Sequence, residues 1–239
     1  MSAAPATRRV FVWDLPTRLS HWALAIAVAG AWLTGEFGPI DKTWHMRFGY
    51  AALVIVAFRV LWGFVGGYHA RFRAFLPKLK GLFGYVATVP RRRPSPHAGH
   101  NPLGVLSVIA LLGVVAVQAT TGLFADDDIF ARGPLARTVS GDTRSQLTSI
   151  HVQLQNLVLG LVLLHLAAIA FYSFWKRQDL ARGMVTGRKT VPETAPDADV
   201  SESRRRGPLW LALGLVLALA ALLWAVITYL PPPPASGWG

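Results

Sequence analysis

Two histidines, His151 and His165, lie fourteen residues apart in an almost wholly apolar segment of the chain. If this segment is an α-helix, fourteen residues fall about 40° short of four full turns and rise roughly 21 Å. The two imidazoles would then point in similar directions at two depths. Imidazole is the commonest metal ligand among side chains, so this spacing could serve two metal-containing groups on one helix.

The composition indicates that such a helix would lie in a membrane. Of the 239 residues, 53% are hydrophobic and only 15% are charged, and the mean hydropathy is +0.40. This composition is too apolar for an ordinary soluble domain of this length.

The chain has no cysteine. This excludes disulfides, thiolate ligands, iron–sulfur clusters and covalent haem attachment through a C-x-x-C-H motif.

Five segments are long and apolar enough to cross the hydrocarbon layer, which takes about 20 helical residues. They are residues 19–36, 45–66, 102–124, 148–175 and 208–230. The first is the shortest and follows several arginines, a pattern that also fits a signal peptide. Because no small-x-small cleavage site precedes the loop GEFGPIDKTW, we expect a retained helix.

The charged residues between these segments predict their orientation. Lys and Arg concentrate in residues 67–101 and 176–206, whereas the other two loops balance acidic and basic residues. The positive-inside rule therefore predicts a cytoplasmic N-terminus, five crossings and a periplasmic C-terminus. The net charge of +12 then reflects topology and attraction to anionic membrane lipid. Because the basic residues flank spans and no recognition motif occurs, we expect no nucleic-acid partner.

Within this topology, four histidines fall into two pairs by depth. His21 lies near the cytoplasmic start of the first span and matches His165; we name these two the inner pair. His45 and His151 lie near the periplasmic starts of their spans and form the outer pair. Histidines inside membrane spans are costly and functional by default. A single one more often makes only an interhelical hydrogen bond, but four that pair by depth indicate a site.

Two imidazoles at each depth suit haem better than zinc. A tetrahedral zinc site needs four ligands at one level, and carboxylates lie near the outer level alone, as Glu36 and Asp41. Haem iron already has four porphyrin nitrogens and takes two axial ligands, for which imidazole is standard. We therefore expect each pair to bind one non-covalent b-type haem, with an outer zinc site as a minor alternative.

An arginine supports the inner site. Arg59 follows His45 by fourteen residues, so on the second span it would lie level with the inner pair. A haem propionate could pair with it through charge-assisted hydrogen bonds, and Arg18 is a second candidate for this role. The alternative is that Arg59 extends to the cytoplasmic head groups.

Other polar residues are weaker candidates. His69, His97 and His100 fall in the cytoplasmic loop, where we expect solvated or interfacial side chains, with His100 the one that could substitute as a ligand. A quinone site would need a polar or titratable group beside a haem at the membrane edge. Several such residues lie at either end of the spans, and the sequence singles out none of them.

The stretch VFVWDLPTRLSHW, residues 10–22, resembles the opening of the first helix in the bacterial cytochrome b561 family. The resemblance is to the branch of nickel–iron hydrogenase cytochrome b subunits, and formate dehydrogenase gamma subunits are similar. It covers residues 9–176. The family carries haem ligands on helices one, two and four, the last with two histidines fourteen apart, and both histidine pairs match these positions. An arginine late in helix two matches Arg59, whereas the last span has no counterpart.

This resemblance and the spans together imply an all-α membrane protein. Residues 19–176 would form a four-helix transmembrane bundle holding two b haems, and residues 208–239 a fifth C-terminal transmembrane helix with a periplasmic Pro-rich tail. Residues 1–18 would be a cytoplasmic N-terminal segment and residues 177–207 a cytoplasmic basic linker.

The implied function is electron transfer in the bacterial inner membrane. The two haems would pass electrons between the membrane quinone pool and a periplasmic redox partner, such as a c-type cytochrome or a dehydrogenase. One alternative is a superoxide oxidase-type enzyme that passes electrons from superoxide to quinone. A second is a non-redox metal-binding or transporter-like membrane protein. Whether the chain is itself a quinone oxidoreductase, and whether two copies form a homodimer, stays open.

Overall fold

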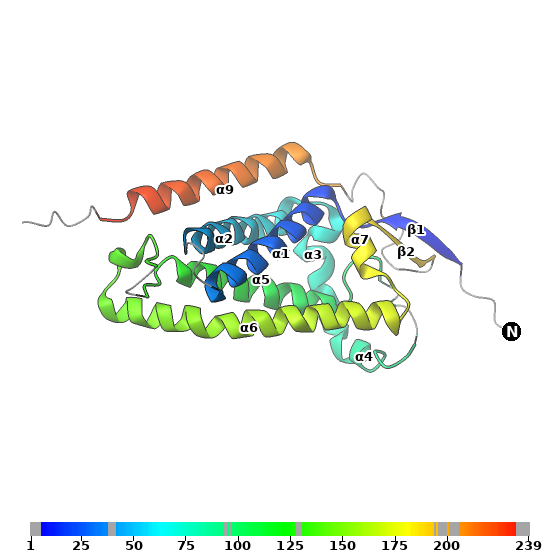
Figure 1. Ribbon diagram of the computed structural model, residues 1–239. Coiled ribbons are helices and arrows are strands. Elements are labelled where there is room, and N and C mark those ends of the chain that lie inside the picture. The colour runs from blue at the N-terminus through cyan, green and yellow to red at the C-terminus, as the bar shows by residue number, and fades with distance from the viewer. Residues whose placement is uncertain are drawn as a thin grey trace, which may run out of the picture. The chain divides into compact units, whose positions relative to one another are not determined.

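The computed structural model describes residues 6–37, 42–92, 95, 97–127, 131–193, 195, 200 and 206–232. The long helices of these residues are α1 (Leu15–Glu36), α2 (Lys42–Val65), α5 (Pro102–Gly122), α6 (Gly141–Phe174) and α9 (Leu209–Tyr229) (Figure 1). Each coincides with one predicted span. The largest difference is at α6, which begins at Gly141 rather than near residue 148.

Four of these helices, α2, α5, α6 and α9, are long and apolar enough to cross a membrane. Little of their surface is buried inside the protein, as expected for helices that are apolar all round and face lipid. The C-terminal helix α9 is one of the four. Helix α1 has 22 residues but is less apolar, since it contains Arg18, His21 and Glu36. A fifth crossing by α1 therefore stays a prediction.

The chain divides into two compact units, and each long helix contributes residues to both. Unit 1 comprises Met1–Trp22, Arg59–Leu112 and Gly160–Leu213. Unit 2 comprises Ala23–Phe58, Gly113–Leu159 and Gly214–Gly239. The inner pair and Arg59 therefore belong to unit 1, and the outer pair belongs to unit 2.

Unit 1 contains a small sheet within the segments expected to be a terminal extension and a linker. Strand β1 (Thr7–Phe11) pairs antiparallel with β2 (Arg188–Pro192), with Val10 opposite Lys189. Helix α7 (Leu180–Thr186) precedes β2, and Gly187 joins them at a φ of 77°, which favours glycine. The segment expected to be a basic linker thus contains a strand, and the described residues form helices and one two-stranded sheet.

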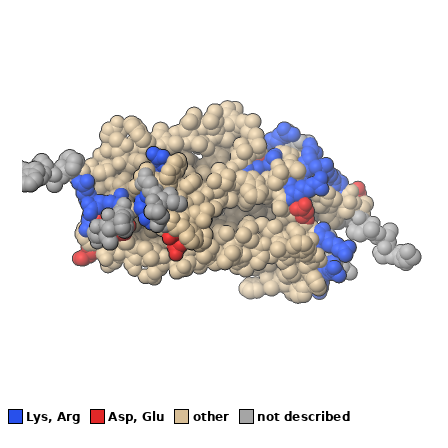
Figure 2. All heavy atoms as spheres, in the orientation of Figure 1, with Lys and Arg blue, Asp and Glu red and all other residues tan. Residues whose placement is uncertain are grey.

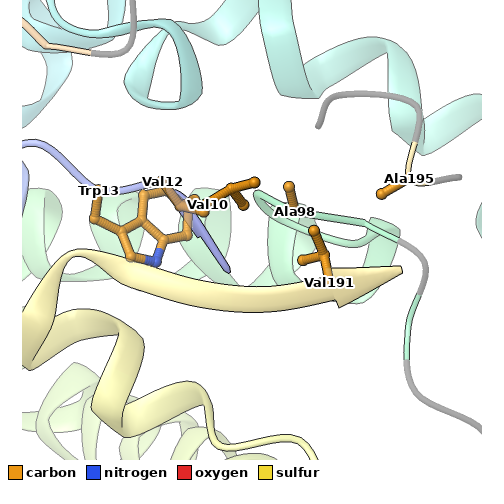
Figure 3. Packing of buried hydrophobic residues seen from close by; sticks show 6 residues of the cluster. All are labelled: Val10, Val12, Trp13, Ala98, Val191 and Ala195. Carbon is orange, nitrogen blue, oxygen red and sulfur yellow. The ribbon is translucent and has the colours of Figure 1, made fainter. Parts of the chain in front are cut away.

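This sheet is held by a cluster of buried apolar side chains from distant segments (Figure 3). Its members are Val10, Val12, Trp13, Ala98, Val191 and Ala195. Lys189 of β2 adds a hydrogen bond, in which its Nζ donates to the backbone carbonyl of His97 at 3.0 Å. The loop before α5 is thereby fixed to both strands.

Four short helical segments connect α2 to this loop. They are η1 (Tyr68–Ala70), α3 (Phe72–Phe75), η2 (Leu76–Gly81) and α4 (Leu82–Val86). Their mixture of basic and aromatic residues is typical of segments at a membrane surface. On the face drawn in Figure 2, Lys and Arg side chains of unit 1 gather around β1, β2 and α7 rather than along the middle of the long helices.

A buried carboxylate joins three helix ends in unit 1. Asp14, 3% exposed, accepts from the backbone N–H of Thr17 at 3.0 Å, as a capping residue of α1 does. It also accepts from the indole N–H of Trp62 at 3.1 Å and from the backbone N–H of Gly67 at 3.0 Å, at the end of α2. The backbone N–H of Gly207, just before α9, donates to it at 3.3 Å.

Replacing Asp14 with alanine should strongly destabilise the protein. The substitution leaves several buried N–H donors without an acceptor, and each such group costs about 1–3 kcal/mol. We expect a loss of about 3 kcal/mol or more, measured by denaturant unfolding of the detergent-solubilised protein followed by circular dichroism. Glu36→Ala is the control, because that exposed carboxylate accepts one hydrogen bond, from Gln155. Equal effects of the two substitutions would contradict this role of Asp14.

Candidate functional site

The inner pair is assembled in unit 1 as predicted. His21 of α1 and His165 of α6 face each other with ring centres 6.3 Å apart and ring planes at 50°. The Nδ1 of His165 lies 3.4 Å from the hydroxyl of Ser107 on α5. The Nδ1 of His21 is buried and has no hydrogen-bond partner in the part of the chain that the structure describes.

The outer pair is assembled in unit 2. His45 of α2 and His151 of α6 have ring centres 6.0 Å apart and ring planes at 87°. The Nδ1–H of His45 donates to the backbone carbonyl of Ala31 at 2.8 Å. The Nδ1–H of His151 donates to the backbone carbonyl of Gln118 at 2.8 Å. These bonds select the tautomer in which Nε2 keeps its lone pair and can bind a metal.

Two glycines let the outer imidazoles lie against neighbouring helices. A Cβ at Gly35 of α1 would lie 3.0 Å from His45 Nδ1, and a Cβ at Gly122 of α5 would lie 2.8 Å from His151 Cε1. Both separations are shorter than side-chain atoms tolerate without moving. The sequence analysis did not single out these glycines, because nothing in their local pattern distinguishes them from other glycines in membrane helices.

The spacing within each pair fits a metal bound between two imidazoles. Two rings that share a metal at about 2 Å from each nitrogen have their centres about 6 Å apart. Within the described ranges, no group of three or more His, Asp or Glu side chains could hold a metal ion. Asp41, one of the carboxylates considered for an outer zinc site, lies outside those ranges. The donors therefore fit a group that needs two axial nitrogens, which is the requirement of haem iron.

The two arginines predicted for the inner site differ in their surroundings. Arg59 interacts electrostatically with His21 and Asp14, so it does lie beside the inner pair. One terminal nitrogen of its guanidinium is buried without a hydrogen-bond partner among the described residues. The guanidinium of Arg18 instead donates to the backbone carbonyl of Val185 on α7. The Nε of Arg18 is also buried without a partner among the described residues, so each arginine keeps one donor nitrogen that an anion could bind.

Two histidines expected to be solvated are packed inside unit 1. His69 is only 4% exposed and lies edge-on to Trp13, with ring centres 6.2 Å apart. His100 has its ring centre 4.6 Å from that of Trp13 and 5.2 Å from that of Phe75. The expectation of a solvated or interfacial side chain is wrong for His69, because the β1–β2 cluster covers the loop. His100 is half-buried, and its Nδ1 is enclosed. His97 is half-buried and lies 3.2 Å from the hydroxyl of Ser95.

Comparisons with known proteins identify a family model and relatives that match the chain. A family model described as prokaryotic cytochrome b561 matches residues 12–187. A probable Ni/Fe-hydrogenase B-type cytochrome subunit from Azotobacter chroococcum mcd 1 is 26% identical over 220 residues, covering 79% of this chain and 91% of the relative. The protein of the same description from Azotobacter vinelandii is 27% identical over 224 residues, with the same two coverages of 79% and 91%. No solved structure is significantly similar to the chain.

Replacing Gly122 with alanine should disturb the outer pair. The added methyl group would push His151 away and break its hydrogen bond to the Gln118 carbonyl, at a cost of about 1–2 kcal/mol. The measurement is the apparent Tm of the detergent-solubilised protein. Gly214→Ala on α9 is the control, since no atom lies within 4 Å of that position and alanine favours the helix. An unchanged Tm for Gly122→Ala would contradict the close approach of His151 to α5.

Proposed function

Because the chain belongs to the prokaryotic cytochrome b561 family, we propose that it is a membrane electron carrier with two b-type haems, one in each histidine pair. The observation that carries this proposal is the geometry of the pairs, with ring centres 6.3 Å and 6.0 Å apart on the expected helices. Both sites draw one ligand from α6, so a single rigid helix would position both haems.

The chain's own residues would fix the orientation of the axial ligands. In the outer pair, each Nδ1–H is held by a backbone carbonyl, which leaves Nε2 free to bind an iron and would make the imidazole a stronger base. When bound, b-type haem supplies a one-electron couple, and two imidazole ligands leave no open iron position. Electron transfer therefore suits these sites better than oxygen binding.

Charged residues of unit 1 would complete the inner site. Arg59 interacts electrostatically with His21 and has a buried guanidinium nitrogen without a hydrogen-bond partner among the described residues, as a partner for a haem propionate should. Arg18 would act mainly as a structural residue, because its guanidinium binds the Val185 carbonyl. Neutralising a propionate raises the reduction potential of the haem, so Arg59 would tune the inner site.

The relatives named as Ni/Fe-hydrogenase subunits support a role beside a redox enzyme. We propose that the chain spans the bacterial inner membrane five times, with the N-terminus in the cytoplasm and the C-terminus in the periplasm. It would pass electrons between membrane quinone and a periplasmic redox partner, of which a hydrogenase-type enzyme, another dehydrogenase or a c-type cytochrome are the candidate classes. The concentration of Lys and Arg in residues 67–101 and 176–206 supports this orientation.

A superoxide oxidase-type reaction is less well supported. It needs an outer surface that attracts superoxide anions, and the sequence offers arginines between α5 and α6. However, Arg132 pairs with Asp126 at 2.6 Å, and Arg144 lies 3.7 Å from the same carboxylate. This pairing reduces the positive field of the loop.

Substitution of single histidines should remove one haem at a time. We expect His45→Ala and His151→Ala to lose the outer haem, and His21→Ala and His165→Ala to lose the inner one, because an iron held from one side alone binds weakly. The pyridine haemochrome assay should give about two haems per wild-type chain and about one per variant. If His45→Ala and His21→Ala delete the same spectral component, the pairing is wrong.

Electron donors should separate the proposed function from its alternatives. Purified protein should show a b-type absorption spectrum, and a quinol should reduce its haems anaerobically, with no superoxide present. Superoxide from xanthine and xanthine oxidase should add little reduction without a protein partner. Efficient haem reduction by superoxide alone would favour the superoxide oxidase-type enzyme. A colourless preparation would support the non-redox metal-binding or transporter-like protein.

A further inference from the structure

We propose that His100 is a second hydrogen-bond donor, next to Arg59, for a carboxylate group of the inner haem. This inference rests on the proposed function and adds a binding residue that the family resemblance does not supply. The ligand chemistry is a propionate-type carboxylate held between a guanidinium and an imidazole. Both side chains belong to unit 1, as do His21 and His165.

The ring of His100 is held in a fixed position just before α5. It packs against Trp13, which belongs to the buried cluster in Figure 3, and against Phe75 of α3. The Nζ of Lys78 donates to the backbone carbonyl of His100 at 3.1 Å and fixes the main chain there. Its Nδ1 is buried and makes no hydrogen bond to any residue that the structure describes. A buried polar atom without a hydrogen bond costs free energy unless another group supplies the partner.

The charges around His100 indicate that the missing partner is an anion. Burial is the main cause that lowers the pKa of His100 to about 3. Four neighbouring groups lower this pKa further: Arg59 of α2, Lys78 of η2, His69 of η1 and Lys189 of β2. Arg59, Lys78 and Lys189 place three cations around a neutral imidazole, and such a setting favours a bound anion.

Asp14 cannot supply that charge to His100 as well. It is the carboxylate that interacts with Arg59, and its oxygens already accept from the N–H groups of Thr17, Trp62, Gly67 and Gly207. Because its hydrogen-bonding capacity is used by the helix ends, it serves the fold. A further carboxylate would satisfy the buried nitrogens of Arg59 and His100, which have no hydrogen-bond partner among the described residues.

Arg59 links this pocket to the inner pair. It interacts electrostatically both with His21 and with His100, so an anion bound by the two donors would lie near the inner haem ligand. The propionates of a haem are the carboxylates that such a site would carry. His100 is therefore assigned as a positioning and tuning residue of the inner haem rather than as a replacement iron ligand.

The test compares donor and non-donor side chains at position 100 in the full-length, haem-loaded protein. Redox titrations with optical detection give the midpoint potential of each haem, and the His21→Ala and His45→Ala variants assign the two components. His100→Leu should lower the potential of the inner haem and leave the outer haem unchanged, because an unneutralised propionate stabilises the ferric state. His100→Gln, which keeps an N–H donor, should restore most of the potential. Arg59→Gln should act in the same direction as His100→Leu.

His97→Leu is the matched control, since His97 lies in the same loop and hydrogen-bonds to Ser95; it should leave both potentials unchanged. An unchanged inner potential in His100→Leu, or loss of the inner haem in both His100 variants, overturns the proposal. If only His100→Leu loses that haem, the donor role is supported. Wild-type protein with fewer than two haems would contradict the proposed function itself, a result distinct from two bound haems that are insensitive to position 100.

Discussion

An imidazole inside an apolar helix must find a partner for each ring nitrogen, because the surrounding hydrocarbon offers none. The arrangement of the histidines in this protein follows from that constraint. In the outer pair, backbone carbonyls of α1 and α5 take the Nδ1–H groups and leave the two Nε2 atoms for a shared ligand. An iron between the two outer rings would satisfy these Nε2 atoms. Each pair takes one histidine from α6.

Both pairs consist of two histidines, but the surroundings of the two pairs differ. The outer imidazoles are held by neutral backbone carbonyls and close helix contacts at Gly35 and Gly122. The inner imidazoles lie in the unit that also contains Arg59, Asp14 and the buried loop histidines. Ligand basicity and nearby charge both change the reduction potential of a haem. If each pair binds one haem as proposed, the two haems would differ in reduction potential.

Local patterns predicted the helices and the pairing of the histidines, because helical periodicity, hydropathy and depth are all properties of short segments. They did not predict the β1–β2 pairing, in which Thr7 lies opposite Pro192, since registry between segments so far apart leaves no local signal. The burial of His69 and the packing of His100 against Trp13 depend on the segments that this sheet joins, and were missed for the same reason. The contact of the Arg18 guanidinium with the Val185 carbonyl is a tertiary contact that no local pattern predicts. Gly35 and Gly122 become meaningful only once the imidazoles are placed against them.

The central claim is that each iron is held by imidazole nitrogens from two helices. Electron paramagnetic resonance of the oxidised, fully loaded protein tests this most directly, because bis-imidazole ferric haem is low-spin. The account predicts two distinguishable low-spin ferric signals, with no high-spin component. A single low-spin species, or a high-spin signal from an iron with an open axial position, would contradict it.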